Sequence, residues 1–399
     1  MDIFWKNKNW EDSDKHLVKL KEMPFKRPFP FIPEANGLYI VRGPRQVGKS
    51  SWLKEVLSHY AEKRKCFYLS CEQLESYREL GALLESLRDY EVVLLDEISF
   101  VKDWARAVKH AVDSGYTKIL MITGSHAFDL KKGSDLMPGR FEGGGDYELL
   151  PMGFDEFALM RKQAGWALES RLEECRAFFR VGGFPAAVAE GGPTAKLPTN
   201  SLKTYWKWLL GDVLKLGKDQ LFLTELLIAI GKFIQEPISL QSLTKNTSIG
   251  SHNTVQEYLS LLESCFAIRT LYSVDIDSGT FHTKRNRKIY FLDPLLYWLS
   301  LDLSGESVSD SAEGKIAELA AHETLARKYS RFGYFRSKNG EIDFVKPRKW
   351  AIEVKWSPIA YNLSKAYYSQ QFPFKVVWTQ ESFFSDMPPA ESSILSNKK

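Results

Sequence analysis

The sequence predicts an α/β protein with a parallel sheet in the N-terminal half, helices in the middle and a second, mixed α/β region near the C-terminus. Between residues 38 and 123, apolar strands alternate with helical segments, which is the pattern of a parallel sheet with helical crossovers. A Gly-bounded loop and a strand that ends in two carboxylates fall inside this alternation. Such features mark the carboxyl edge of open α/β sheets, where ligands bind.

Composition sets the broad class. The chain has 399 residues, of which 44% are hydrophobic, and a formal net charge of +4. This length predicts about two to four domains, and the weak charge means that any nucleic-acid surface must be local. The four cysteines are scattered, so we expect a reducing compartment and no zinc site. The N-terminus does not resemble a signal peptide and no apolar run reaches the ~18 residues that span a bilayer, so we expect a cytoplasmic protein with no membrane partner.

The first motif is the loop at residues 43–50, which fits G-x-x-x-x-G-K-[ST] between a strand at 38–42 and a helix at 50–60. Gly43 and Gly48 permit close backbone approach, so that N–H groups can face phosphate oxygens. Lys49 would contact the β- and γ-phosphates, and Ser50 would bind Mg²⁺. The alternative is a chance Gly-rich turn. The predicted nucleotide-binding residues are Gly43, Pro44, Arg45, Gln46, Val47, Gly48, Lys49, Ser50 and Ser51.

The second motif is the apolar run at 92–95 that ends in Asp96 and Glu97. A buried parallel strand presents such acids at its carboxyl end. Asp96 would hold Mg²⁺ through water, and Glu97 would polarise the attacking water. The alternative is a core strand that runs into a solvated acidic turn.

Two further positions complete this candidate site. After the strand at 118–123, the hydroxyl of Thr123 or Ser125 could sense the γ-phosphate, although a plain strand-ending turn fits either residue equally well. Arg140 lies on a loop beyond the sheet and is a candidate arginine finger for the nucleotide of a neighbouring subunit. The alternative for Arg140 is an ordinary surface arginine.

The segments GPRQVGKS, LLDEISFVKDW, MITGS, LMPGRFEGGGDYELLPMGFDEF and VGGFPAAV resemble, in this order, the bacterial and archaeal AAA-type ATPases with a GPRQVGKT phosphate-binding loop. The resemblance runs from about Trp5 to Lys355. It departs at Ser99 and His126, where the family usually has Gln and Ser, and both positions bear on the turnover rate. The resemblance implies ATP binding at Gly48, Lys49 and Ser50, hydrolysis through Asp96 and Glu97, sensing at Ser125, and an arginine finger at Arg140.

The domain organisation follows the change of pattern along the chain. We expect a lead-in at 1–36 anchored by Trp5 and Trp10, a P-loop AAA-type ATPase core at 37–155, and a helical lid and linker at 156–221. Helices at 155–165, 168–179 and 202–216 form this lid, because their apolar residues recur at helical spacing. The Gly-Gly-Phe-Pro turn at 182–185 should act as a joint between two of them.

The order of the elements expected in residues 222–300 predicts a winged helix-turn-helix. A helix at 223–234, a short helix from 239 and a capped helix from 253 precede strands at 267–274 and 288–291, which is the order of that module. The resemblance places such a module here too. Winged helices also bind proteins, so DNA is one of two possible partners. The candidate DNA contacts are Asn253 and Gln256 on the capped helix, and Lys284, Arg285, Arg287 and Lys288 in the basic loop before the last strand.

Residues 301–382 resemble the PD-(D/E)XK nucleases. Glu318 lies on a helix at 314–329, Asp343 on a strand at 340–345, and Glu353 and Lys355 on a strand at 350–355. Because side chains alternate along a strand, Glu353 and Lys355 project to one face, where Asp343 and Glu353 could share Mg²⁺ or Mn²⁺. The alternative is a solvated charge pair on an exposed hairpin. We expect residues 383–399 to form a loose tail.

Together these features predict an ATP-hydrolysing, homo-oligomeric protein that acts on DNA, with a Mg²⁺-dependent nuclease-like domain at its C-terminal end. One alternative is a regulatory or antitoxin-like switch in which the nuclease fold does not cut and serves as a docking platform. A third possibility is a signalling ATPase whose C-terminal modules hold only proteins.

Overall fold

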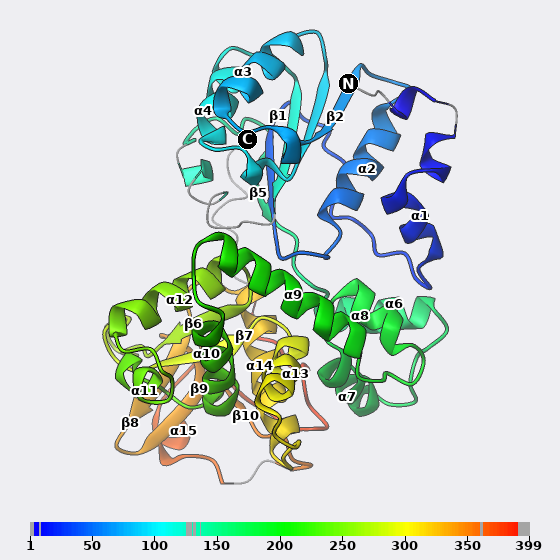
Figure 1. Ribbon diagram of the computed structural model, residues 1–399. Helices are drawn as coiled ribbons and strands as arrows, with labels where there is room; N and C mark the ends of the chain where they lie inside the picture. Colours follow the sequence, from blue (N-terminus) through cyan, green and yellow to red (C-terminus); the bar gives the residue numbers. More distant parts are fainter. Residues whose placement is uncertain are drawn as a thin grey trace.

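The computed structural model describes residues 4–7, 9–124, 130, 133–135, 137–359 and 362–389. Two lobes are visible in Figure 1: a sheet with its flanking helices, built from the first part of the chain, and a larger lobe that begins at α6. Among the described residues, no helix is both long enough and apolar enough to cross a bilayer.

A five-stranded sheet forms the centre of the first lobe. Its strands are β1 (Gly37–Arg42), β2 (Cys66–Ser70), β3 (Val92–Asp96), β4 (Ile119–Gly124) and β5 (Gly145–Glu148). They are arranged in the order β2-β3-β4-β1-β5, and all neighbours are parallel. The predicted parallel sheet is therefore confirmed. Strand β5 was not expected, because its sequence Gly-Asp-Tyr-Glu is polar and it lies at the sheet edge.

Helices cover both faces of this sheet. They are α1 (Lys15–Glu22), α2 (Lys49–Tyr60), α3 (Tyr77–Ser86) and α4 (Trp104–Asp113). Figure 1 shows α2, backed by α1, on one face and α3 and α4 on the other. The lead-in is held by Trp5 and Trp10, which are both buried as expected. The Trp5 ring meets the edge of Phe67 in β2, with 5.9 Å between centroids.

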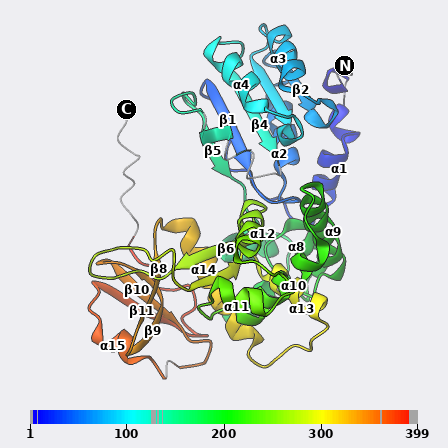
Figure 2. The ribbon, with the colours of Figure 1, turned by 60° about the vertical axis from the view of Figure 1, so that its left-hand side comes forward.

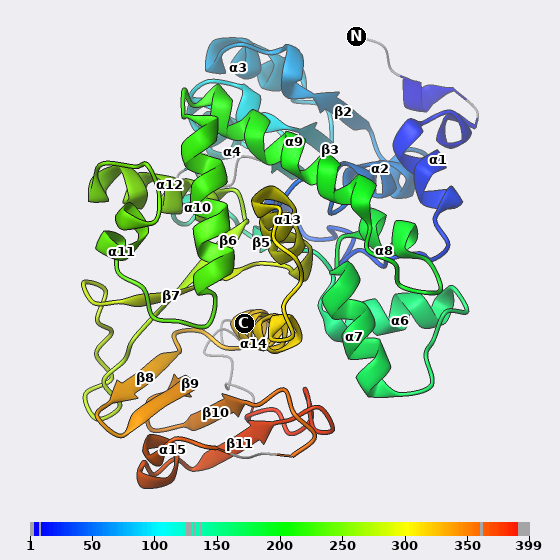
Figure 3. The same cartoon turned by 60° about the horizontal axis from the view of Figure 1, so that its bottom comes forward.

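The second lobe begins with four helices, α6 (Phe154–Gln163), α7 (Arg171–Val181), α8 (Pro185–Gly191) and α9 (Thr199–Lys215). Three further helices, α10 (Gln220–Phe233), α11 (Leu240–Lys245) and α12 (His252–Ser264), lead into an antiparallel hairpin of β6 (Ile268–Tyr272) and β7 (Arg287–Phe291). An isolated bridge between Ile238 and Arg287 adds a third extended segment beside β7. Figure 3 shows α9 running from α8 towards α10 and α12.

The C-terminal part is a second sheet. After α13 (Pro294–Ser304) and α14 (Ala312–Lys328), it contains β8 (Gly333–Ser337), β9 (Gly340–Lys346), β10 (Trp350–Val354), α15 (Lys365–Ser369) and β11 (Phe374–Trp378). The strand order is β11-β10-β9-β8, with β10 and β11 parallel and the other pairs antiparallel. Helix α14 lies between this sheet and α13 (Figure 3). Figure 2 shows the sheet as a separate layer.

The expectation of a loose tail from residue 383 was wrong for its first part. Phe383 and Phe384 are buried, and the Phe383 ring packs against Phe179 of α7 and Trp356. The Arg171 guanidinium donates to the Phe383 carbonyl at 3.1 Å. Two adjacent aromatic side chains thus fix a segment whose Ser- and Pro-rich surroundings predicted no structure; residues 390–399 lie outside the described residues.

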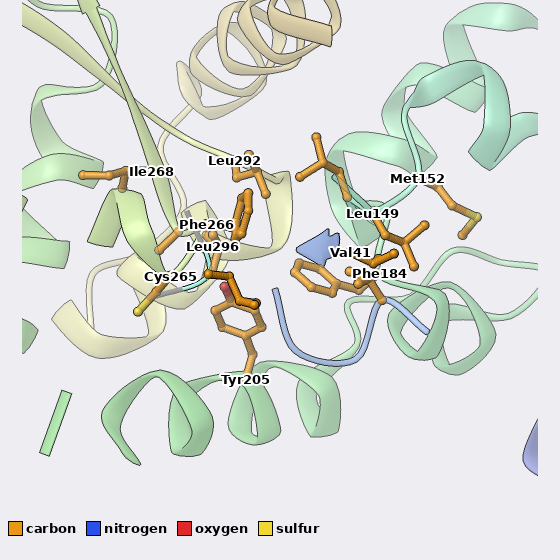
Figure 4. Packing of buried hydrophobic residues seen from close by; sticks show 14 of the residues in the cluster. Val41, Leu149, Met152, Phe184, Tyr205, Cys265, Phe266, Ile268, Leu292 and Leu296 are labelled. Carbon is orange, nitrogen blue, oxygen red and sulfur yellow. The ribbon is translucent and has the colours of Figure 1, made fainter. Parts of the chain in front are cut away.

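One hydrophobic cluster passes from the first lobe into the second. Figure 4 shows where they meet: Val41 of β1 and Leu149 lie beside Phe184, while Tyr205 of α9 lies near Phe266. A continuous core of this kind resists independent movement of the two lobes, because separating them would expose apolar surface to water.

The Gly-Gly-Phe-Pro turn at 182–185 is a junction of three chain segments. Gly183 donates its N–H to the Asp293 carboxylate at 2.7 Å and accepts a hydrogen bond from the N–H of Met152 at 2.8 Å. Asp293 also accepts the N–H of Leu295 at 2.9 Å. A Cβ on Gly183 would lie 1.9 Å from the Met152 carbonyl oxygen. Glycine is therefore required here by close packing, and the turn joins the lid to the β7–α13 connection.

Asp293 should make the stability of the protein depend on pH. Burial raises the pKa of its carboxyl from 3.8 to about 7. The folded chain then holds the proton more tightly than the unfolded chain. The contribution of Asp293 to the free energy of unfolding is therefore complete below about pH 4 and is lost as the pH rises to about 7.

We expect wild-type protein to lose stability between about pH 5 and about pH 8 relative to Asp293→Asn, by up to about 1.4 kcal/mol per pH unit inside the titration window. Thermal unfolding of both proteins at the two pH values measures this difference. Parallel changes in the two proteins would show that Asp293 is ionised throughout.

Candidate functional site

The phosphate-binding loop joins β1 to α2 at the carboxyl edge of the first sheet. Gly48 caps α2 with φ of 103°, and Gln46 has φ of 64°. Both angles lie in the left-handed region of backbone conformation. Glycine adopts this region at little cost, which explains the glycine at position 48. Helix α2 begins at Lys49, so the N–H groups of its first turn and the positive end of its dipole face the loop, as an anion site requires.

Lys49 is buried at the base of this loop. Its ammonium group donates to the carbonyls of Gly43 at 2.9 Å and Pro44 at 2.8 Å. Burial lowers the pKa of Lys49, and the nearby carboxylates of Glu97 and Asp96 oppose that change. Lys49 and Glu97 also line the same cavity, and Asp96 directly precedes Glu97, so the predicted lysine and the two predicted acids lie at one edge of the sheet.

Gly43 has a packing role in addition to the one that its position in the motif predicts. A Cβ there would lie 2.0 Å from the Leu149 carbonyl oxygen, on the segment that leaves β5. The Leu149 N–H donates to the Arg42 carbonyl at 2.7 Å, which fixes this approach. Glycine at 43 thus allows the chain after β5 to pass against the loop.

Gly43→Ala should therefore destabilise the protein severely. Overpacking costs about 1–3 kcal/mol even where neighbours can move, and here the obstacle is backbone. Thermal unfolding should show a Tm several degrees below wild type. Gly211→Ala in α9 is the matched control, because no atom lies within 4 Å of its Cβ position; it should leave Tm unchanged or raise it. A Gly43→Ala protein with wild-type Tm would contradict the packing argument.

Asp96 ends β3 and is held by three donors. It accepts hydrogen bonds from the Tyr68 hydroxyl at 3.1 Å, from the Glu97 N–H at 3.1 Å and from the Thr123 hydroxyl. Burial and the Asp96 charge raise the pKa of Tyr68, so its hydroxyl remains a donor. Tyr68 was not predicted, because the register between neighbouring strands that brings it to Asp96 is not visible in the sequence.

Glu97 has φ of 52°, a left-handed conformation that a non-glycine residue adopts at a cost of about 1–3 kcal/mol. Its N–H lies 3.4 Å from the Thr123 hydroxyl and 3.1 Å from Asp96. Such local strain concentrates at functional sites. Of the two predicted sensing hydroxyls, Thr123 lies among these acids, whereas Ser125 lies outside the described residues.

Two arginines that bind the loop to its surroundings complete the site. Arg45, within the loop, pairs with Asp212 of α9 through contacts of 2.6 and 3.1 Å. Arg27 of the lead-in donates to the Val47 carbonyl at 3.1 Å and pairs with Glu156 of α6 at 2.7 Å. The two contacts connect the loop to helices α9 and α6. Arg27 was not predicted as a site residue, since no motif marks it.

A cavity of about 460 Å³ opens beside the loop. The loop residues from Arg45 to Ser51 and Glu97 line one side of it, Leu20 and Met23 of the lead-in line another, and Trp208 of α9 lies on the lid side. Its volume and mixed polar and apolar lining suit a small-molecule ligand with a charged end and a planar end.

Arg140 lies near the amino end of the first sheet. It pairs with Asp113 at the end of α4 through contacts of 2.6 and 3.3 Å. The next residue, Phe141, accepts a hydrogen bond from Leu38 at the start of β1. The phosphate-binding loop follows the other end of β1. The strand rises about 3.3 Å per residue between these two ends. Within one chain, Arg140 and the loop therefore lie at opposite ends of the sheet.

The structure separates the six predicted DNA contacts into two groups. Asn253, Lys284 and Arg285 are exposed. Arg287 is buried and donates to the half-buried Gln256 at 2.8 Å. Lys288 is fully buried. Its assignment to a phosphate-gripping loop was therefore wrong, as was that of Arg287, because both belong to strand β7 and their side chains are enclosed by the fold.

The predicted nuclease-like residues come together in the C-terminal sheet. Strands β9 and β10 are antiparallel, and their last paired residues are Phe344 and Ile352. Asp343, just before Phe344, and Glu353, just after Ile352, therefore lie next to this last pair, where the strands separate. The Asp343 N–H donates to Glu353 at 3.3 Å, and the Val354 N–H donates to Asp343 at 2.9 Å. Each carboxylate thus satisfies an N–H on the opposite strand.

Two lysines form ion pairs with this acidic group. Lys355 pairs with Glu353 at 2.9 Å, which confirms that the two side chains share a face. Lys288 of β7 lies 2.9 Å from Glu318, 2.7 Å from Glu341 and 3.3 Å from Asp343. Burial opposes the charge of Lys288, but the surrounding carboxylates outweigh it and hold the pKa of Lys288 well above its usual value.

The same surroundings change the pKa values of the acids in this group. Burial and the adjacent Asp343 raise the pKa of Glu318 and that of Glu353 to about 7. The Tyr290 hydroxyl donates to Glu318 at 2.5 Å. Glu341, Tyr290 and the position of Lys288 were not predicted, because strands of two different sheets contribute them.

The two candidate metal positions differ. At the phosphate-binding loop, Ser50 in the first turn of α2 offers a hydroxyl and Asp96 at the end of β3 offers a carboxylate, and these oxygen donors are of the kind that Mg²⁺ prefers. In the C-terminal sheet, the ammonium of Lys288 already lies among the carboxylates, so these residues do not fit a metal. Within the described ranges, no group of three or more His, Cys, Asp or Glu is arranged to hold a metal ion.

Comparison with known proteins gives two family matches: residues 35–158 match the AAA domain, and residues 172–307 match a domain of unknown function. An uncharacterized protein of Haemophilus influenzae is 25% identical over 348 residues, which is 81% of this chain and 82% of that protein. An uncharacterized protein of Methanocaldococcus jannaschii is 25% identical over 340 residues, covering 78% and 72%.

Among solved structures, the Aeropyrum pernix ORC2 protein in ADPNP–ADP complexes is similar at 12% identity and a TM-score of 0.37, over 73% of this chain and 89% of that chain. At this identity and score, the likeness supports no statement about activity or partners.

Proposed function

We propose, from the AAA-type P-loop domain of residues 35–158, that this protein is an ATP-hydrolysing switch whose nucleotide state controls a C-terminal binding platform. The observation that carries the proposal is that Lys49 and Glu97 line one cavity at the carboxyl edge of a parallel sheet, where Asp96 ends β3. A lysine under a glycine-bounded loop and an acid pair at the end of another strand of the same sheet, here with β4 between the two strands, are the parts that P-loop hydrolases use.

Each residue has a distinct role in this proposal. The loop N–H groups and Lys49 hold the phosphates, while Ser50 and Asp96 hold Mg²⁺, which would neutralise charge on the phosphate oxygens. Glu97 orients and polarises the attacking water. Thr123 and Tyr68 keep the Asp96 carboxylate in place by hydrogen bonds.

Coupling to the rest of the chain would run through the lid. Arg45 links the loop to Asp212 of α9, and Arg27 links it to Glu156 of α6. A phosphate group that attracts Arg45 would compete with Asp212 for the same guanidinium. A change in this pairing would move α9, which borders the continuous core in Figure 4.

DNA is the partner that we propose for the platform, through a winged helix formed by residues 222–300 and a PD-(D/E)XK-like module at 301–382. The element order from α10 to β7 and the exposed Asn253, Lys284 and Arg285 support it. With three such contacts, phosphate attraction would dominate over base reading. In a homo-oligomer, Arg140 would act on the nucleotide of the adjacent subunit after release from Asp113.

Fluorescence anisotropy of labelled duplex DNA tests this proposal. With a non-hydrolysable ATP analogue and Mg²⁺, binding should weaken as salt rises, and the double change Lys284→Ala with Arg285→Ala should reduce the logarithmic salt slope by about 2. The exposed Lys63 on the first lobe is the control; Lys63→Ala should leave the slope unchanged. Affinity that does not respond to nucleotide in wild type, or that equals that of Lys49→Ala, would refute nucleotide control.

The competing candidate is a Mg²⁺-dependent nuclease, because Glu318, Asp343, Glu353 and Lys355 gather at one place; it would require Lys288 to leave Glu318 and Asp343. Incubation with linear, single-stranded, forked and supercoiled DNA in Mg²⁺ or Mn²⁺ separates the two candidates. Cleavage by wild type but not by Lys355→Ala would establish the nuclease. ATP hydrolysis without any cleavage would favour the non-cutting switch.

A further inference from the structure

Lys288 occupies the centre of the nuclease-like acidic group. It comes from β7, in the hairpin that precedes this module, and only 1% of its surface is exposed. Its ammonium contacts Glu318, Glu341 and Asp343 at 2.7–3.3 Å. The ring of Tyr334 lies beneath it, with 5.7 Å between Nζ and the centroid.

The carboxylate oxygens that a metal would need are already in use. Asp343 accepts a hydrogen bond from the Val354 N–H at Oδ2 and pairs with Lys288 through Oδ1. Glu353 accepts a hydrogen bond from the Asp343 N–H at Oε2 and pairs with Lys355 through Oε1. A divalent cation such as Mg²⁺ requires oxygen ligands at about 2.0–2.1 Å in an octahedral arrangement and keeps several waters. The enclosed ammonium of Lys288 at Asp343 and Glu318, and that of Lys355 at Glu353, take the place of the ion and its waters.

The hairpin that carries Lys288 is fixed to the C-terminal sheet. The Val274 N–H donates to the Tyr334 carbonyl at 2.9 Å, and the Tyr334 hydroxyl donates to the Asn286 carbonyl at 2.7 Å. Val274 and Phe281 pack with Ile342 of β9. These contacts on both sides of the hairpin hold Lys288 in position as part of the fold.

We propose that Lys288 is a built-in counter-ion that replaces the divalent metal of the nuclease-like site and joins the β6–β7 hairpin to the C-terminal sheet. The site is then an ion-paired structural joint. Removing the ammonium should convert the same carboxylates into a divalent-cation site. This inference does not rest on the proposed nucleotide switch, since it involves no residue of the phosphate-binding loop.

Mn²⁺ binding to the nucleotide-free protein, followed by electron paramagnetic resonance of the free ion, tests the proposal in two comparisons. In the first, wild type and Asp343→Asn should bind the same number of Mn²⁺ ions. A Mn²⁺ ion bound by wild type and lost in Asp343→Asn would overturn the proposal. This comparison needs no change at Lys288.

In the second comparison, Lys288→Met should bind one more Mn²⁺ per chain than wild type, at least about tenfold more tightly than the double variant with Asp343→Asn. Lys288→Met should also unfold at a lower temperature than wild type and regain part of that loss when Mn²⁺ is added. A folded Lys288→Met protein that gains no Mn²⁺ would overturn the proposal. If Lys288→Met does not fold, the wild-type comparison decides.

Discussion

Glu97→Gln is expected to lower kcat for ATP hydrolysis about 10²–10⁴-fold while ATP still binds. Glutamine preserves the size of the side chain but cannot take up a proton, and a positioned general base contributes a rate factor of this order. The left-handed backbone at Glu97 directs the residue away from the line of β3, next to the Thr123 hydroxyl. Steady-state phosphate release and the binding of a fluorescent ATP analogue measure the two effects separately.

Two further variants serve as controls for the effect of Glu97→Gln. Lys49→Ala should abolish nucleotide binding as well as hydrolysis, because Lys49 would no longer contact the phosphates. Glu62→Gln, an exposed carboxylate after α2, should change neither. A Glu97→Gln enzyme that retains more than about a third of wild-type kcat would show that the base lies elsewhere.

The ATPase core was predictable because its signals are local. Strands β1 to β4 are continuous apolar runs and the loop motif is contiguous, so the limits of the strands and of α2 were predicted within a few positions. The polar edge strand β5 gave no such signal. The contacts of Arg45 with Asp212 and of Arg27 with Glu156 join residues 167 and 129 positions apart, and no periodicity reports pairings at such separations.

Residues 301–382 show the limit of prediction from sequence patterns. The order of Glu318, Asp343, Glu353 and Lys355 predicted that they would share one site, and they do. The basic run at 284–288 was interpreted as one surface, although Lys284 and Arg285 are exposed while Arg287 and Lys288 are enclosed. The partners of Lys288 lie 30 and 55 residues further along the chain. Charge alone could not reveal a lysine buried among distant acids.

Phe383→Ala is expected to lower the free energy of unfolding by about 3–5 kcal/mol, the usual cost of truncating a fully buried phenylalanine. The Phe383 side chain is 0% exposed, and its ring centroid lies 4.1 Å from that of Phe384 and 5.1 Å from that of Trp356. Thermal and urea unfolding measure the loss. Tyr368→Ala, at a residue that is 67% exposed, is the aromatic control and should change stability by less than about 0.5 kcal/mol.

The position of Phe383 makes the consequence more than local. Its ring contacts Phe179 of α7 on one side and Trp378 of β11 on the other, so it joins the lid to the C-terminal sheet. If nucleotide-dependent movement of the lid reaches the platform through this contact, Phe383→Ala should also reduce the effect of nucleotide on DNA affinity while leaving ATP hydrolysis intact. Equal loss of stability in Phe383→Ala and Tyr368→Ala would instead show that this segment leaves the sheet surface in solution.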